Sequence, residues 1–305
     1  MNNEDTAYIE INTLLKYLWR GKYIIFIITL LFSLISVFYA LSIPNYYKSS
    51  ALLKVAGQNS NPSIMSQYSG LASIAGISLP SNGSQNDAYL ATATLKSRDF
   101  LNHLIKLDDE IVPALIATKD YDIINANIIY DKNSYDVATN KWIREPSYPF
   151  KTIPSNLEVY EKYINEVLST SIDKESGYIS ISVQHISPKF AYKFLNLIIS
   201  EINALSRAND LESSKSALEY LYLEASKNSI VSIDSSINNL IEAQLKTQMM
   251  AQVSDEYLLE IIDEPFIPEL KNGPNRKSIS IIGFLIGIIV SSLGSIIFYL
   301  RLDES

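Results

Sequence analysis

The chain has 305 residues, a formal net charge of −8 and no cysteine. Without cysteine there are no disulfides and no thiolate chemistry, which is compatible with an exported domain. Acidic residues are spread along the chain and no basic patch stands out, so nucleic-acid binding is not expected.

Uncharged apolar runs lie near both ends of the chain. They extend from Tyr23 to Ile43 and from Ser278 to Leu300. A bilayer core takes about 20 helical residues to cross, and a backbone in hydrocarbon must hydrogen-bond to itself. Both runs are therefore predicted to be transmembrane helices. The first run is longer than the apolar core of a typical signal peptide, so we expect it to be retained.

The charges beside the first run predict its orientation. Lys16, Arg20 and Lys22 precede it closely. Basic residues in short flanking segments stay in the cytoplasm. We therefore expect a cytoplasmic segment 1–22, a span 23–43, an outer domain 44–277, a second span 278–300 and a cytoplasmic tail 301–305.

The first half of the outer domain mixes strand, loop and helix patterns. Lys48 to Val55 alternates and predicts a strand. Val55 to Asn86 is uncharged and rich in Ser and Asn, which predicts a loop with room for a short helix at 64–77. Asp87 to Ile105 is helical in pattern, and Asp120 to Phe150 reads as irregular. The expected core residues of that helix are Leu90, Leu95, Leu101, Leu104 and Ile105.

Further on, Ser155 and Glu158 form a capping box that opens a helix to about Val167. Leu168–Asp173 and Tyr178–His185 then predict a hairpin. Its second strand has one apolar face and one polar face, which favours an antiparallel or mixed sheet, and we expect a small mixed sheet. The apolar face consists of Ile179, Ile181 and Val183.

A long helical stretch follows. Ser187 and Pro188 predict a helix start with Ser at the N-cap, and no Gly or Pro follows from Lys189 to Glu264. Bends are expected at the Ser- and Asn-rich points near Asn228 and Ser235. Because a helix of 40 residues is about 60 Å long, we expect it to protrude or to pack against copies of itself. Its two apolar stripes are Phe194, Ile198, Ile202 and Leu205, and Ile230, Ile233, Ile237, Leu240 and Gln244.

The second apolar run and its approach carry the candidate functional residues. Gly283, Gly287, Ser291 and Ser295 are each four residues apart. Small residues at this spacing let membrane helices approach closely, so we predict a packing face toward a neighbouring helix of another protomer or of a partner. The plain alternative is that Gly and Ser are common in such helices.

Three prolines precede this run, at Pro265, Pro268 and Pro274. Proline cannot continue a helix, so the segment is predicted to be a stiff extended connector outside the core.

Catalytic patterns are not found. His103 and His185 lie on separate predicted elements with no His or Cys nearby, so a metal site is not expected. The chain has neither a P-loop nor a nucleophile elbow. We expect no cofactor, no metal and no catalytic residues.

With this order of elements the chain resembles the bacterial polysaccharide co-polymerases, the Wzz-type chain-length determinants. The residues that carry the resemblance are Tyr47–Ala51, Ile179–Val183 leading into Ser187–Ala191, Leu240–Gln244, Ala251 and the proline-rich Asp263–Glu269 with Asn272–Pro274. The resemblance implies an α+β fold in which two transmembrane helices flank a periplasmic domain with a long protruding helix.

By the same resemblance, the protein is expected to be a non-enzymatic regulator in a bacterial inner membrane. It would form a homo-oligomeric ring and set the length of lipopolysaccharide O-antigen or a related surface polysaccharide, together with a membrane polymerase and a lipid-linked glycan. Only 301–305 follow the second run, so no kinase domain is expected there. The alternatives are an adaptor or activating subunit of an export or kinase system, and a membrane enzyme acting on lipid-linked sugars.

Overall fold

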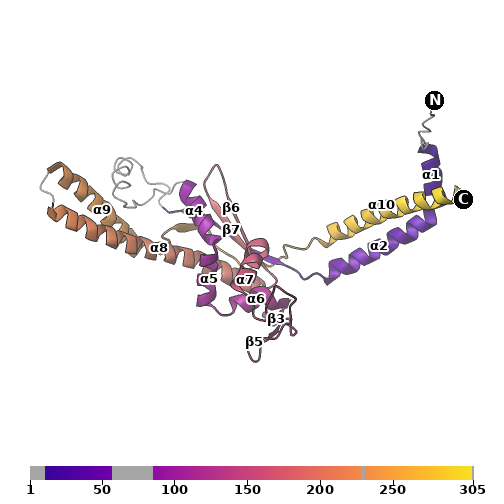
Figure 1. The fold of residues 1–305 in the computed structure, drawn as a ribbon, viewed down its shortest axis with the longest axis horizontal. Coiled ribbons are helices and arrows are strands. Elements are labelled where there is room, and N and C mark those ends of the chain that lie inside the picture. The colour runs from indigo at the N-terminus through magenta and orange to yellow at the C-terminus, as the bar shows by residue number, and fades with distance from the viewer. Residues whose placement is uncertain (1–10, 57–84, 228–230, 304–305) are drawn as a thin grey trace. The chain divides into compact units, whose positions relative to one another are not determined.

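The computed structural model describes residues 11–56, 85–227 and 231–303. Its contacts divide the chain into two units (Figure 1). The membrane unit combines Met1–Asn45 with Lys271–Ser305, and the central unit is Tyr46–Leu270.

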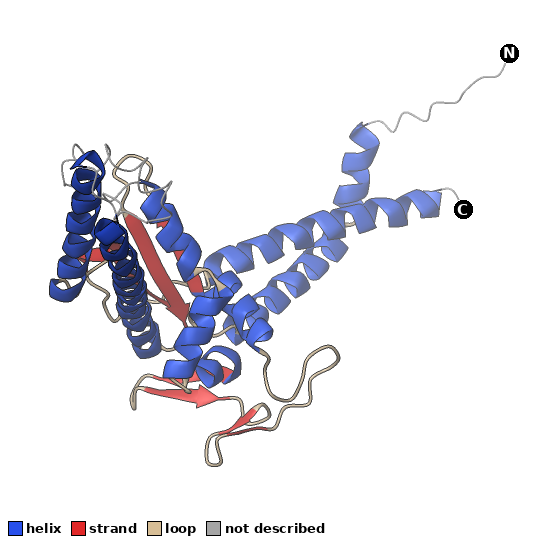
Figure 2. Cartoon of the chain, turned by 60° about the vertical axis from the view of Figure 1, so that its left-hand side comes forward, coloured by secondary structure: helices blue, strands red, loops and turns tan. Residues whose placement is uncertain are grey.

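In its described residues the membrane unit consists of helices α1 (Ile11–Arg20), α2 (Lys22–Ser42) and α10 (Arg276–Asp303). Helices α2 and α10 are long and apolar enough to cross a membrane, with mean hydropathies of 2.7 and 2.5. They lie side by side (Figures 1 and 2). Both predicted spans are therefore present as helices, whereas α1 was not predicted from the sequence.

The central unit is built on a four-stranded sheet in the order β6-β7-β1-β8. Every neighbouring pair is antiparallel. The predicted strand and hairpin are confirmed, but the prediction of a mixed sheet is wrong. The returning strand β8 pairs with β1 rather than with β7, and β1 runs opposite to both. The four strands are β1 (Tyr47–Val55), β6 (Leu168–Ile172), β7 (Ile179–His185) and β8 (Leu259–Asp263).

Helices pack around the apolar side chains of this sheet and enclose one hydrophobic core. The covering elements are α4 (Gln85–Leu95), α5 (Arg98–Leu107), α6 (Ile111–Ala117), α7 (Asn156–Lys162), the π-helical turn η1 (Tyr163–Val167) and the first part of α8 (Pro188–Lys227). The expected face of β7 is buried, as are Phe194, Ile198 and Ile202 of the first apolar stripe.

The helix predicted from Asp87 to Ile105 is two helices. Ser97 separates them because its side chain caps α5 and accepts a hydrogen bond from the backbone N–H of Phe100 at 3.1 Å. Leu90 was predicted to lie in the core, but 65% of it is exposed. The reason is helical geometry: Ala91 and Leu95 of α4 face the core, and Leu90 precedes Ala91 by about 100° of rotation.

Both predicted N-caps are present. Ser155 accepts a hydrogen bond from the backbone N–H of Glu158 at 3.2 Å, and α7 with η1 continues to Val167 as expected. Ser187 accepts from the backbone N–H of Phe190 at 3.2 Å, and α8 begins at Pro188. These two short-range signals position the helices on the sheet.

The long helical stretch forms two helices that pack against each other. Helix α8 has 40 residues, and α9 (Val231–Val253) runs antiparallel to it. Leu221 of α8 packs with Ile237 and Leu240 of α9. The long helix is therefore present, and α9 covers one side of it, a partner within the chain that was not among the expected ones. Ile230, the side chain of Ile233 and the helix suggested at 64–77 lie outside the described residues.

The segment predicted to be irregular contains two small antiparallel hairpins. They join β2 (Thr118–Asp122) to β3 (Asn127–Tyr130), and β4 (Tyr135–Asp136) to β5 (Lys141–Trp142). Strands of two to five residues among Asp- and Asn-rich turns are too short to give a clear alternation.

Candidate functional site

The stripe of small residues on α10 faces α2 of the same chain. A Cβ added at Gly287 would lie 2.9 Å from Cβ of Phe32 and 3.2 Å from Cα of Thr29. A Cβ added at Gly283 would overlap the side chain of Ser36. Glycine is therefore what lets the two backbones approach this closely.

Hydroxyl groups continue this close contact between α2 and α10, which we call the seam. The Oγ atoms of Thr29 and Ser291 are 3.2 Å apart and buried, and Ser36 donates to the carbonyl of Ile279 at 2.9 Å. Ser295 donates to the backbone carbonyl of Tyr17 at 3.4 Å and is also buried. Each of these hydroxyl groups therefore has a hydrogen-bond partner within the unit, as an apolar surrounding requires.

The predicted stripe is thus brought together, but against a different partner. We expected a helix of another protomer or of a partner protein, and the structure places α2 there. Spacing tells which residues share a face, and it does not tell which helix covers that face.

Two residues of the seam were missed in the sequence. Gly21, between α1 and α2, has no room for a Cβ because Ser295 Oγ occupies that space. The ring of Tyr17 on α1 stacks on Tyr299 of α10, with centroids 6.4 Å apart. The feature of the sequence that could have revealed this contact was the single glycine, Gly21, between Arg20 and Lys22.

Two of the three prolines belong to the edge of the sheet. Pro265 and Pro268 are buried, which corrects the expectation that they lie outside the core. Between them, the carbonyl of Phe266 accepts a hydrogen bond from Oγ of the buried Ser49 on β1 at 2.7 Å. The segment continues past β8 alongside β1, where the Ser49 hydroxyl satisfies the Phe266 carbonyl, while the two prolines have no N–H to donate to a strand ladder.

Pro274 lies in the membrane unit, half-buried, two residues before α10. Close to it, Arg276 Nη2 donates to the carbonyl of Ile43 at 3.3 Å, and Lys271 Nζ lies 3.4 Å from Oδ1 of Asn45. These contacts join the outgoing and returning segments at the end of the membrane unit.

A buried amide that the sequence did not reveal fixes β8 to α8. Asn203 Oδ1 accepts hydrogen bonds from the backbone N–H groups of Leu258 and Leu259, both at 2.8 Å. Its Nδ2 donates to the carbonyl of Leu259 at 3.0 Å. About two turns further along α8, the hydroxyl of Tyr257 donates to Asp210 at 2.7 Å. A polar residue beside the apolar stripe of α8 was the signal that could have drawn attention to Asn203.

The two histidines have structural partners. His103 Nε2 lies 2.8 Å from Glu201 Oε2, joining α5 to α8. His185 at the end of β7 is buried, and its Nε2–H donates to the carbonyl of Ala114 at 2.9 Å while Nδ1 accepts from the backbone N–H of Ser187 at 3.0 Å. Burial lowers the pKa of His185 from 6.5 to about 4, so the ring is neutral. Within the described ranges, no cluster of His, Cys, Asp or Glu side chains is arranged to hold a metal ion.

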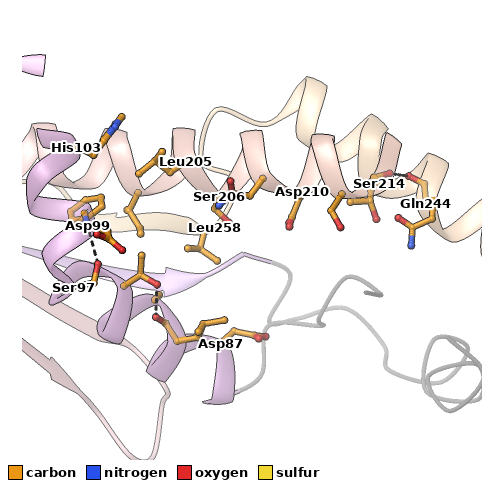
Figure 3. A pocket seen from close by; sticks show the side chains of 18 residues that line it. Asp87, Ser97, Asp99, His103, Leu205, Ser206, Asp210, Ser214, Gln244 and Leu258 are labelled. Atoms are coloured by element: carbon orange, nitrogen blue, oxygen red, sulfur yellow. Dashed lines mark hydrogen bonds between the residues drawn. The ribbon is translucent and has the colours of Figure 1, made fainter. Parts of the chain in front are cut away.

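A cavity of about 530 Å³ opens between α4 and α5 on one side and α8 and α9 on the other (Figure 3). Hydroxyl, amide and carboxylate groups line much of it, including Ser206, Asn209, Ser213 and Thr247. Part of this lining already has structural bonds, since Ser214 donates to the carbonyl of Gln244 at 2.9 Å. The chemistry of the remaining groups suits hydrogen bonding to a hydroxyl-rich ligand.

Comparison with known proteins gives one family match. Residues 8–107 match the family of the Wzz chain length determinant protein. This stretch includes α1, α2, β1, α4 and α5, and therefore joins the first span to the beginning of the central unit. No curated protein matches the chain.

Two solved structures are similar to the chain at low identity. A full-length bacterial polysaccharide co-polymerase is 13% identical with a TM-score of 0.39, over 97% of this chain and 99% of that one. A fragment of WzzB, a polysaccharide co-polymerase from Salmonella Typhimurium, is 11% identical with a TM-score of 0.29, over 75% and 100%. At these identities and TM-scores, neither structure supports a conclusion about this chain. Residues 8–107, about a third of the chain, are therefore similar to the Wzz chain length determinant family.

Proposed function

We propose that this protein is a non-enzymatic regulator of polysaccharide chain length, acting on lipopolysaccharide O-antigen or a related surface polysaccharide together with a membrane polymerase. The observation that carries the proposal is the family match over residues 8–107. The two helices able to cross a membrane, α2 and α10, support it because such a regulator must work where a membrane polymerase works.

The proposed location is a bacterial inner membrane, with both termini in the cytoplasm and 44–277 in the periplasm. Lys16, Arg20 and Lys22 around α1 support this orientation. Alkylation of single cysteines placed at Glu175 and at Lys16 tests it, because only the first should react with an impermeant reagent in spheroplasts.

The proposed working form is a homo-oligomer. Helix α9 covers one side of α8, yet large apolar side chains remain exposed on both helices. They are Tyr220, Tyr222 and Leu223 on α8, and Leu245, Met249, Met250 and Val253 on α9. Contiguous exposed apolar surface usually marks an interface. Light scattering on the detergent-solubilised chain should therefore find several copies per particle, and a monomer at every concentration would contradict this.

A direct glycan contact is proposed in the cavity of Figure 3. Asn209 and Ser213 are exposed at its wall and carry groups that can bond to sugar hydroxyls. Replacing both with Ala should shift the glycan length distribution, whereas Glu212→Ala, on the same helix but not in the cavity wall, should not. The same glycan length distribution for the two variants would show that the cavity does not bind the glycan.

Deletion of the gene followed by gel separation of the surface glycan tests the function itself. A regulator of length predicts that glycan is still made, with an altered length distribution that the intact gene restores. Loss of all glycan would favour an export or synthetic role, and an unchanged distribution would contradict the proposal.

A further inference from the structure

Two loops of the central unit hold large apolar side chains in solvent. The first is the tip of the β2–β3 hairpin, where Ile123 is 72% exposed and Ile124 is 93% exposed. Asp122 orders this tip, because its Oδ1 accepts from the backbone N–H of Ile124 at 2.9 Å and its Oδ2 accepts from the side chain of Asn125 at 2.7 Å. The isoleucines are therefore presented by a hydrogen-bonded turn.

The second loop lies between β5 and α7. Tyr148 is 96% exposed in it, and Ile153 is 68% exposed. Arg144 holds the loop, donating to the carbonyl of Thr152 at 2.9 Å and to that of Lys151 at 2.7 Å. The same guanidinium pairs with Glu158 at 2.5 Å, so the loop is tied at its base to α7.

Both loops are attached to the end of the sheet where β1 begins. Near the first loop, the carbonyl of Ala114 accepts hydrogen bonds from Thr118 at the start of β2 and from His185, which is the partner of Tyr47 in the sheet. Near the second loop, Glu166 lines one cavity together with Phe150 and a second cavity together with Tyr46. Tyr46 and Tyr47 are therefore a common neighbour of two loops that are far apart in the sequence.

This end of the sheet cannot be far from the bilayer. Helix α2 ends at Ser42, and only 43–45 separate it from Tyr46. An extended chain spans at most about 3.6 Å per residue, so Tyr46 lies within about 14 Å of the end of α2 whatever the arrangement of the two units. The headgroup region on one side of a bilayer is about 5–8 Å thick. Loops beside Tyr46 and Tyr47 are within reach of it.

We propose that these two loops form a lipid-binding surface, in which Ile123, Ile124, Tyr148 and Ile153 enter the boundary between headgroups and acyl chains. This proposal rests on α2 and α10 crossing the membrane. A lipid surface fits better than a protein partner, because nearly fully exposed side chains at separate loop tips do not form a continuous face. Tyrosine is also a side chain that favours this boundary, since its ring is apolar and its hydroxyl polar.

The absence of cysteine from the chain allows a direct test. Ile124→Cys and Tyr148→Cys are labelled with bimane in the full chain, which is reconstituted into vesicles of phosphatidylethanolamine and phosphatidylglycerol with or without doxyl-labelled lipid. Glu175→Cys is the matched control, because it is exposed in the β6–β7 turn at the opposite end of the sheet. Ile289→Cys in α10 reports insertion of the span.

Doxyl lipid should quench the labels at Ile124→Cys and Tyr148→Cys at least about twofold more strongly than the label at Glu175→Cys, because the quencher sits in the boundary region. Equal quenching at the three positions, with Ile289→Cys quenched, would overturn the proposal while leaving the spans intact. Labels protected from both doxyl lipid and aqueous iodide would overturn it in favour of a protein contact. An unquenched Ile289→Cys would remove the membrane insertion on which the proposal rests.

Discussion

Two antiparallel helix pairs in this protein are held together by different means. The α2–α10 pair uses glycine and hydroxyl groups, with Gly287 against Thr29 and Ser291 bonded to Thr29. The α8–α9 pair uses a small cluster of branched side chains, Leu221, Ile237 and Leu240. One pair is apolar on its outside, and the other carries charged residues along its length.

The difference follows from the solvent of each pair. In lipid, burying a leucine between helices gains little, so close backbone approach and satisfied hydroxyls stabilise the pair. In water, burying apolar surface contributes about 25 cal/mol per Å², so a few large side chains suffice. A change that adds bulk should therefore damage the first pair, and one that removes bulk should damage the second.

Adding bulk at Gly287 is expected to have the largest effect. A leucine there meets the backbone of α2, so the helices must separate or shift. Cysteines at Thr29 and Ser291, whose hydroxyls are 3.2 Å apart, report pairing by disulfide formation. Gly287→Leu should lower cross-linking about tenfold, in line with the roughly 1–3 kcal/mol that overpacking costs. Gly294→Leu is the control, because a Cβ at Gly294 meets nothing within 4 Å; equal cross-linking in both variants would refute the seam.

Lowering the pH from 6.5 to 4 should destabilise the central unit but not the seam, because the hydroxyl groups of the seam do not titrate in this range. The folded pKa of His185 is about 4 against an ordinary 6.5, so the unfolded chain binds the proton more readily between these values. Stability of the central unit is then complete above about pH 6.5 and is progressively lost as the pH falls to 4, by up to about 3 kcal/mol.

Unfolding of the detergent-solubilised chain across this pH range measures the effect. His185→Gln should flatten the dependence, since an amide can still donate to Ala114 and accept from Ser187 without taking up a proton. A variant with the same pH slope as the wild type would show that other groups cause the loss.

Removing bulk from the α8–α9 pair should weaken it locally. Leu240→Ala takes a buried side chain from a small cluster and should cost about 2–3 kcal/mol. Hydrogen exchange of α9 amides should accelerate accordingly, while the amides of β1 and β7 keep their protection. Met249→Ala is the control because Met249 is exposed on the same helix. Similar exchange in the two variants would mean that the cluster does not hold the pair.

The smallest effect on stability is expected at the prolines. Pro268→Ala should cost the central unit about 0.4–1 kcal/mol through backbone freedom, with a small addition because Pro268 is buried. If the segment acts as a stiff joint, Pro268→Ala and Pro274→Ala should broaden or shorten the glycan distribution at normal oligomer size. An unchanged glycan with a lost oligomer would show that these residues serve assembly instead.

Short-range signals in the sequence were sufficient for much of the fold. The uncharged runs located α2 and α10, and Ser155 and Ser187 located two helix starts, because each signal is complete within a few residues. A bend was expected near Asn228, and α8 ends at Lys227, but the return of α9 along α8 was not predicted, since no Gly or Pro marks a turn between Lys189 and Glu264.

The candidate site was predictable in its residues and not in its contacts. The spacing of Gly283 and Gly287 indicated a packing face, but the covering helix lies more than 240 residues away in the chain. Ser49 and Asn203 carry hydrogen bonds to residues far along the sequence, and a single chain offers no local sign of such pairs. For the same reason the burial of Pro265 and Pro268 beside β1 was not foreseen.

We propose that the glycine seam between α2 and α10 belongs to a device that sets glycan length. The most direct measurement is the surface-glycan ladder of the deletion strain carrying either Gly287→Leu or Gly294→Leu, at matched protein levels in the membrane. An altered distribution is expected for Gly287→Leu, and the wild-type distribution is expected for Gly294→Leu. A wild-type ladder for both variants would contradict it.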